Sequence, residues 1–325
     1  MPKLEYAGEV CEGNAKLVKQ LETVQMTAAK KILRCLSTTS NTVLRAELGM
    51  HPLKTNRDMR KLNWQYKVKS MPKQRLPAIV DRAVWEKVTK GRAGIRWDGV
   101  VEKVWKDIRG NQGEIMSAGK FGRYKAKVEE SIERRERLAQ RNKVESEKHF
   151  EIYGGLREGL GMKTYLHGPM DFAKTLKLRF RVGDLDMPER RKRYTSSREE
   201  GEVGAQVCPC GKAIESRTHI VSECEIYKTE RDVLEEEMRE TDECEMEEFN
   251  TMNSSEKTIA ILGDRWWPQE AKQEGDKISK KFIYNVWKQR NERPIVGGVS
   301  IRSRNGVPSR NGRVVNGQMT KASNN

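Results

Sequence analysis

Hydrophobic positions along most of the chain recur at steps of three and four residues, the spacing of one face of an α-helix. The clearest stripe runs through a single short segment: Trp97, Val100, Val101, Val104, Trp105 and Ile108. The same spacing predicts helices over residues 14–36, 41–48, 53–71, 120–150, 172–181, 228–248 and 277–293. We therefore predict an all-α chain of loosely connected helical clusters.

Glycine and proline mark the expected breaks between these helices. Gly49 is a predicted helix stop, and Gly154-Gly155 together with Gly159 and Gly161 indicate a flexible joint. The segment from Gly183 to Pro188 breaks the helix before it. Beyond Pro294 the chain has five bases and no acids, with many Gly, Ser and Asn residues, which predicts a disordered tail.

Charge is abundant and unevenly distributed. Hydrophobic residues make up 36% of the 325 residues and charged residues 34%, with a formal net charge of +16. Residues 225–257 hold thirteen acids and four bases, a balance of -9, so the remainder carries 16 + 9 = +25. Such an excess favours RNA or DNA as the partner, because neutralised phosphates release counterions. Charged helix faces in water, or a nuclear address at Arg190–Arg193, would also account for it.

No apolar run is long enough to cross a bilayer, and Met1–Glu5 has no apolar signal core, so we expect an intracellular protein without a membrane partner. These features do not distinguish a nuclear from a cytoplasmic protein. In a reducing compartment the six cysteines should be thiols or metal ligands rather than disulfides.

Three of the cysteines lie beside a histidine in the pattern C-x-C-x8-H-x4-C, formed by Cys208, Cys210, His219 and Cys224. Three thiolates and one imidazole complete a tetrahedral zinc site with no position for a catalytic water, so the predicted Zn²⁺ is structural. The four ligand atoms should lie within about 4–5 Å of one another. An ideal helix would turn His219 and Cys224 about 140° apart, so the last ligand must lie at a helix end. Three free thiols and a surface histidine are the alternative.

A basic arm precedes this cluster, with nine bases and three acids between Lys174 and Arg198. A zinc module beside a basic arm suits contact with phosphates. The predicted nucleic-acid-binding residues are Lys174, Lys177, Arg179, Arg181, Arg190, Arg191, Lys192 and Arg193. No small-molecule substrate is indicated.

Catalytic signatures are missing. The chain has no Asp-Asp pair, no phosphate-binding G-x-x-x-x-G-K-[ST] loop and no H-E-x-x-H motif, so we do not expect an enzyme. One alternative is a Mg²⁺-dependent endonuclease that uses Asp264, Glu270 and Lys272. Trp266-Trp267-Pro268 fills the gap between these residues, which favours a buried aromatic corner instead.

The order of motifs resembles the region downstream of the polymerase core in non-LTR (LINE-type) retrotransposon reverse transcriptases. The matching blocks are Ala46–Leu53, Leu176–Gly183, the Cys-Pro-Cys…Thr-His…Cys cluster and Val286–Asn291, within residues 10–293. The resemblance implies a helical thumb followed by a CCHC zinc module, with the zinc ligands at Cys208, Cys210, His219 and Cys224. The palm carboxylates of that family have no counterpart here, so it implies a fragment that binds nucleic acid and does not polymerise alone, with the remainder of a polyprotein as a further partner.

These observations predict five segments. They are a thumb-like helical region (1–118), a long charged helix with a basic linker (119–200), the zinc module with an acidic helix (201–250), a C-terminal helical segment (251–293) and the basic tail (294–325). A non-catalytic protein-interaction scaffold, in which acidic helix 228–248 docks onto a basic partner or onto the chain's own basic body, is the remaining alternative.

Overall fold

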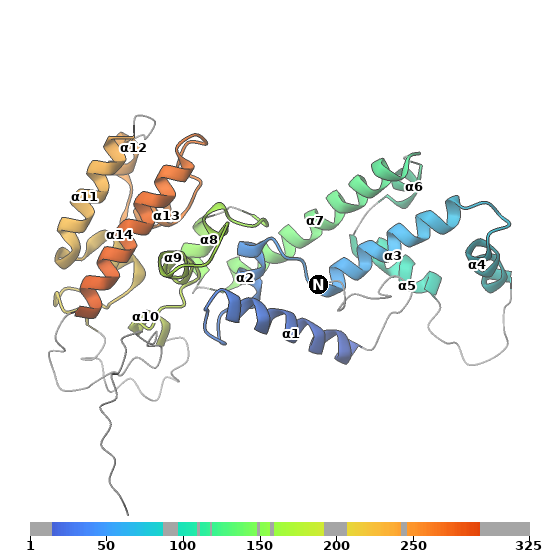
Figure 1. Cartoon of the computed structure of the whole chain (residues 1–325), viewed down its shortest axis with the longest axis horizontal. Helices are drawn as coiled ribbons and strands as arrows, with labels where there is room; N and C mark the ends of the chain where they lie inside the picture. The colour runs from blue at the N-terminus through green and yellow to red at the C-terminus, as the bar shows by residue number, and fades with distance from the viewer. Residues whose placement is uncertain are drawn as a thin grey trace, which may run out of the picture.

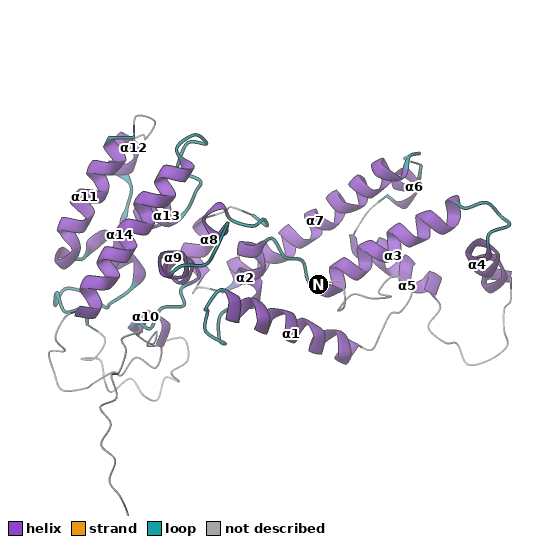
Figure 2. Ribbon diagram, viewed as in Figure 1, coloured by secondary structure: helices purple, strands orange, loops and turns teal. Residues whose placement is uncertain are grey.

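The computed structural model of the chain describes residues 15–86, 97–108, 111–117, 119–147, 150–156, 159–191, 207–241 and 246–292. Figure 2 shows helices joined by loops, and the described residues form no extended strand. Only two isolated bridges occur among them, Leu48 with Met162 and Val207 with Ile214. The predicted all-α class is confirmed, and the second bridge closes the short hairpin at the cysteine cluster.

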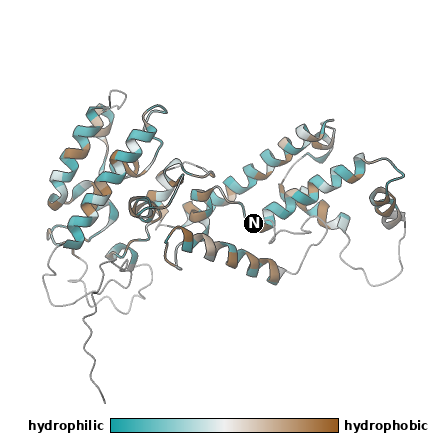
Figure 3. Ribbon diagram, in the orientation of Figure 1, coloured by the Kyte–Doolittle hydropathy of each residue, from teal (hydrophilic) through white to brown (hydrophobic). Residues whose placement is uncertain are grey.

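The first half of the chain contributes seven helices to the described residues: α1 (Ala15–Ile32), α2 (Asn41–Leu48), α3 (Leu53–Ser70), α4 (Leu76–Glu86), α5 (Trp97–Ile108), α6 (Gln112–Met116) and α7 (Phe121–Ser146). Gly49 ends α2 with a left-handed φ of 62°, as its position predicts. The stripe from Trp97 to Ile108 forms α5, as expected. In Figure 3, α3 and α7 are mostly hydrophilic, which fits their thin apolar lines.

A small apolar core joins α3, α5, α6 and α7 near one end of the molecule (Figure 1). Its buried members are Leu62, Val101, Val104, Trp105, Ile108, Ile115, Tyr124, Val128 and Ile132. The indole of Trp105 donates to the Gln65 side chain at 2.9 Å, so the buried polar atom is satisfied. Packing here accounts for the apolar stripe of α5.

The second half contributes α8 (Glu151–Leu156), η3 (Thr164–Leu166), α9 (Phe172–Val182), α10 (Pro188–Arg191), η5 (His219–Glu223), η6 (Glu225–Tyr227), α11 (Lys228–Arg239), α12 (Met246–Thr251), α13 (Ser254–Leu262) and α14 (Lys272–Glu292). A larger core joins these elements to α1 and α2, with Met26, Leu44, Phe180, Ile261 and Phe282 among its members. This core crosses the boundaries of the five predicted segments.

Helix α7 connects the two cores. Tyr124, near its start, lies in the small core, whereas Val144, near its end, lies in the larger one. Its outer face carries i,i+4 ion pairs such as Arg134–Glu130 and Arg141–Glu145. The elongated arrangement in Figure 1 follows from this single long helix between two packed ends.

The predicted flexible joint at Gly154-Gly155 is wrong. Both glycines lie inside α8. A methyl group on Gly155 would overlap the side chain of Ile259, so the glycine permits close packing of α8 against α13. Gly155 therefore allows α8 to pack closely on α13 and does not form a joint.

Several further elements differ from expectation. Helices α4, α6, α8 and α13 were not predicted, and the acidic helix ends at Arg239 rather than continuing to residue 248. Asn253 begins α13 with a full capping box to Glu256, a signal present in the sequence. Acidic helix α11 packs on α14 through Leu234 and Met238, so it covers part of its own chain. The predicted tail, 294–325, lies outside the described residues.

Candidate metal centre

A tight loop positions the first two cysteines. Val207 bridges Ile214, and the backbone N–H of Cys208 donates to the Ala213 carbonyl at 2.7 Å. The N–H of Gly211 donates to the Cys208 carbonyl at 2.8 Å, and Gly211 has a φ of 76°. Only a residue without a Cβ adopts this turn at no steric cost, so Gly211 lets the chain fold back after Cys210.

A widened helical turn positions the other two side chains. Residues His219–Glu223 form a π-helical turn, closed by a 2.7 Å hydrogen bond from the Cys224 N–H to the His219 carbonyl. Such turns are rare and occur often at functional sites. The i to i+5 bond brings the two ligands to the same side, which an ideal α-helix would not do.

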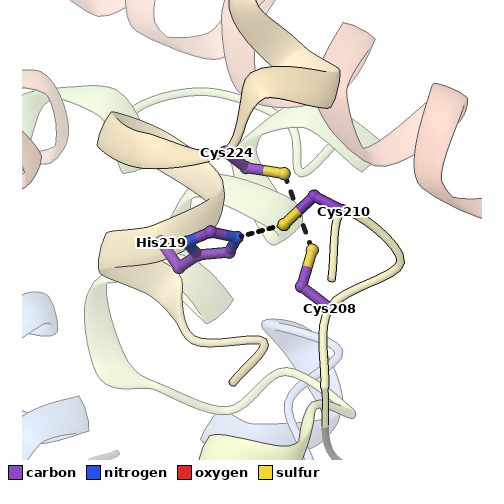
Figure 4. A group of neighbouring side chains, drawn as sticks. All are labelled: Cys208, Cys210, His219 and Cys224. Atoms are coloured by element: carbon purple, nitrogen blue, oxygen red, sulfur yellow. Dashed lines mark hydrogen bonds between the residues drawn. The ribbon is translucent and has the colours of Figure 1, made fainter. Parts of the chain in front are cut away.

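The four side chains converge on one point, as Figure 4 shows. One ligand atom from each of Cys208, Cys210, His219 and Cys224 lies within 4.8 Å of the others. The sulfurs of Cys208 and Cys224 are 3.6 Å apart, and His219 Nε2 lies 3.2 Å from the Cys210 sulfur. The predicted convergence is confirmed, and the sulfur separation matches the value of just under 4 Å expected around a tetrahedral ion.

The surroundings give the thiols unequal acidity. Burial raises the pKa of Cys208 to about 12. Burial acts in the same direction on Cys210, but hydrogen bonds from the Lys212 backbone N–H and from His219 outweigh it and lower the pKa of Cys210 to about 7. A metal ion would have to displace protons from the more buried thiols.

A carboxylate orients the histidine ring. The Nδ1 atom of His219 lies 3.2 Å from Glu223 Oε2, while Nε2 faces the sulfurs. A proton on Nδ1, donated to Glu223, leaves the Nε2 lone pair directed at the ligand cluster. The spacing of four residues from His219 could have identified Glu223 from the sequence, because i and i+4 share a helix face.

Arginines attach this module to the helical core. Arg217 is buried and donates to the carbonyls of Phe180 and Arg181 at 3.0 and 3.2 Å, at the end of α9. It also pairs with Glu189 at 2.8 Å, and Arg290 of α14 pairs with Glu215 at 2.6 Å. The cysteine cluster is therefore joined to α9 and α14 by charged hydrogen bonds.

A metal ion held here would have a structural role. Four protein ligands would fill a tetrahedral shell and leave no position for water or substrate. Cys208, His219 and Cys224 are buried, and only Cys210 is partly exposed. No other group of three or more Cys, His, Asp or Glu side chains in the described parts of the chain could hold a metal ion.

Two of the predicted phosphate contacts are buried, which is a correction to the sequence prediction. Lys177 is 1% exposed and pairs with Asp276 at 2.8 Å. Arg181 is fully buried and pairs with Glu47 at 2.9 Å. The sequence could not distinguish these cations from surface ones, because their partners lie about 100 or more residues away.

Of the other predicted contacts, some form hydrogen bonds or ion pairs within the chain, and others lie outside the described residues. Lys174 donates to the His167 and Pro169 carbonyls, and Arg179 donates to the Arg34 carbonyl at 2.6 Å. Arg190 pairs with Asp184 at 3.2 Å. Arg191 ends α10, and Lys192 and Arg193 lie outside the described residues. The α9 cations thus stabilise the fold.

The residues of the endonuclease alternative belong to a packed corner. Trp267 is 3% exposed, lies edge-on to Trp266 with ring centroids 5.2 Å apart, and packs over Gly275. Asp264 accepts from Thr164, while Lys272 donates to the Gln269 side chain at 2.7 Å. The aromatic corner favoured by the sequence is present.

Comparison with protein-family models, curated proteins and solved structures finds no match for this chain. None of the described helices is long and apolar enough to span a membrane. The geometry of the site and the distribution of charge therefore carry the functional argument.

Proposed function

We propose that the chain is a nucleic-acid-binding region without a polymerase site of its own, whose C-terminal half is held together by a structural Zn²⁺ ion. The convergence of Cys208, Cys210, His219 and Cys224 carries this proposal. A set of three thiolates and one imidazole suits zinc, whereas hard cations such as Mg²⁺ prefer oxygen ligands.

Nucleic acid is the partner that the charge favours. The chain carries a formal +16, and the acidic stretch 225–257 lies partly in α11, which packs on α14. The excess positive charge therefore resides on the rest of the molecule, where a polyanion would release counterions on binding. RNA and DNA are both compatible with this argument.

The parent protein is proposed to be a reverse transcriptase of the non-LTR retrotransposon type, within the cell. The resemblance of the motif order supports this, and the thumb-like helices would precede the zinc module as they do in that family. The chain has no Asp-Asp pair, so polymerisation is assigned to a palm that this sequence does not contain.

A binding titration tests the proposal. Labelled single-stranded RNA and DNA are titrated with the chain at several salt concentrations, and zinc is measured on the same sample. We expect affinity to fall with salt, with a log–log slope near -0.7 for each phosphate contacted on single strands. A zinc-loaded, folded chain that binds neither RNA nor DNA at low salt would overturn the proposal.

A further inference from the structure

A group of exposed cations without ion pairs lies at one end of the molecule. Six lie where α3 ends and α7 begins: Lys67, Lys69, Lys73, Arg75, Lys120 and Arg123. All six are exposed, and no ion pair joins any of them to a carboxylate in the described residues. Figure 1 places this end opposite the metal centre, on the far side of α7.

Most cations further along α7 do not share this property. Lys125, Lys127, Arg134, Arg137 and Arg141 each pair with a glutamate. None of the six cations has an acid within four residues of it in the sequence, so none can form an ion pair within its own helical turn. Positive charge therefore accumulates at the α3–α7 end, where no carboxylate of the described residues pairs with these six cations.

An aromatic stack reaches the surface among these cations. Tyr66 stacks on Tyr124 with ring centroids 4.3 Å apart, and Phe121 lies 5.6 Å from Tyr66. Tyr124 is buried, whereas Phe121 is 36% exposed. The Lys67 ammonium lies over the Phe121 ring, 5.2 Å from its centroid. A partly exposed ring thus lies directly beside unpaired cations.

Hydrogen bonds hold the stack rigid. The Tyr124 hydroxyl donates to the Leu62 carbonyl at 2.7 Å, and the Tyr66 hydroxyl donates to the Gly119 carbonyl. Each bond joins the α3 side of the stack to the start of α7. A ring in a fixed position loses little conformational freedom when a planar ligand stacks on it.

We propose that this surface binds single-stranded nucleic acid, with a base stacked on Phe121 and phosphates at Lys67, Lys120 and Arg123. The inference rests on the proposed function and assigns it to a surface that the sequence did not indicate. Proteins that bind single strands combine cationic grooves with aromatic platforms, because every base offers a π-face.

The test compares variants of the full chain by fluorescence anisotropy with a labelled single-stranded oligonucleotide and with its abasic counterpart. We expect Phe121→Ala to weaken binding to the intact strand by roughly ten- to one-hundredfold and to change binding to the abasic strand little. Phe121→Trp should keep the affinity. Because Phe121→Ala could loosen the stack, its circular dichroism and thermal melting are compared with wild type.

Charge variants provide a second, independent readout. Lys120→Ala/Arg123→Ala changes two exposed side chains without ion pairs and should flatten the log–log salt slope by about 1.4. Arg137→Ala on the same helix removes a cation paired with Glu133 and serves as the matched control.

If wild type binds and both Phe121→Ala and the double variant bind with the same affinity as wild type, this inference alone is overturned. Wild type that binds no strand would overturn the proposed function as well.

Discussion

Glu223 is the residue that orients His219, the histidine of the candidate metal centre. Its carboxylate contacts His219 Nδ1, and a lost partner of this kind typically lowers metal affinity by about 10–100-fold. We therefore expect Glu223→Ala to weaken zinc binding by this factor in a competition with a chromophoric chelator. Glu225→Gln changes a neighbouring carboxylate that pairs with Lys212 and should have little effect. Equal affinities for the two variants would contradict the role of Glu223.

The thiols predict how metal affinity depends on pH. Burial raises the pKa values of Cys208 and Cys224, so both carry protons at pH 7 in the metal-free protein. Zinc must displace these two protons, and protons compete more strongly as pH falls. Apparent affinity should therefore increase by about 100-fold per pH unit between pH 7 and 8. A pH-independent affinity would show that the thiols do not bind the ion.

Gly155 tests the close packing of α8 on α13. A methyl group there meets the Ile259 side chain, so Gly155→Ala should lower the free energy of unfolding by about 1–3 kcal/mol. Gly99, in α5, has no atom within 4 Å of an added methyl group, so Gly99→Ala should be neutral or stabilising by up to about 1 kcal/mol. Denaturant melts of the two variants distinguish close packing from a general intolerance of glycine replacement.

At the scale of the helices, the sequence predicted those helices that have a clear stop residue or a clear apolar stripe. The end of α2 follows from Gly49, and α5 follows from its apolar stripe. Helix α4 was not predicted. Its hydrophobic side chains Leu76, Ile79 and Val80 are exposed in the structure. Because these hydrophobic residues are not on a buried face, their spacing does not show which helix α4 packs against.

Spacing predicted the cluster, its convergence and a last ligand at a helix end, where Cys224 lies, but it did not predict the π-helical turn. The spacing C-x-C-x8-H-x4-C specified the four side chains, and an ideal helix would have separated His219 from Cys224. The π-helical turn resolves this conflict through one i to i+5 hydrogen bond. Such turns have no sequence signal that residue spacing alone reveals.

Over the whole molecule, buried ion pairs determine which basic residues remain for a ligand. Arg181 pairs with Glu47, which also accepts from the Tyr165 hydroxyl at 2.5 Å. Local sequence cannot reveal such pairs, because the partner is 134 residues away. Among the predicted contacts of the basic arm, Lys177 and Arg181 are therefore not accessible to a ligand.

Removing this pair separates stability from binding. Arg181→Ala leaves the buried Glu47 carboxylate without its partner and should cost about 3–5 kcal/mol of unfolding free energy. The folded fraction should still bind nucleic acid with the wild-type salt slope, because Arg181 is fully buried. Denaturant melts and anisotropy titrations on the same preparation measure the two quantities. A stable variant with a flatter salt slope would show that Arg181 contacts phosphate.

The metal content of the purified chain, measured together with its thermal stability, tests the central claim most directly. We predict about one zinc ion per chain, a marked loss of thermal stability when a chelator removes it, and no bound zinc in Cys224→Ser. Cys35→Ser, which changes a cysteine outside the cluster, should retain the ion. A metal-free chain that melts at the same temperature with and without added zinc would contradict the account.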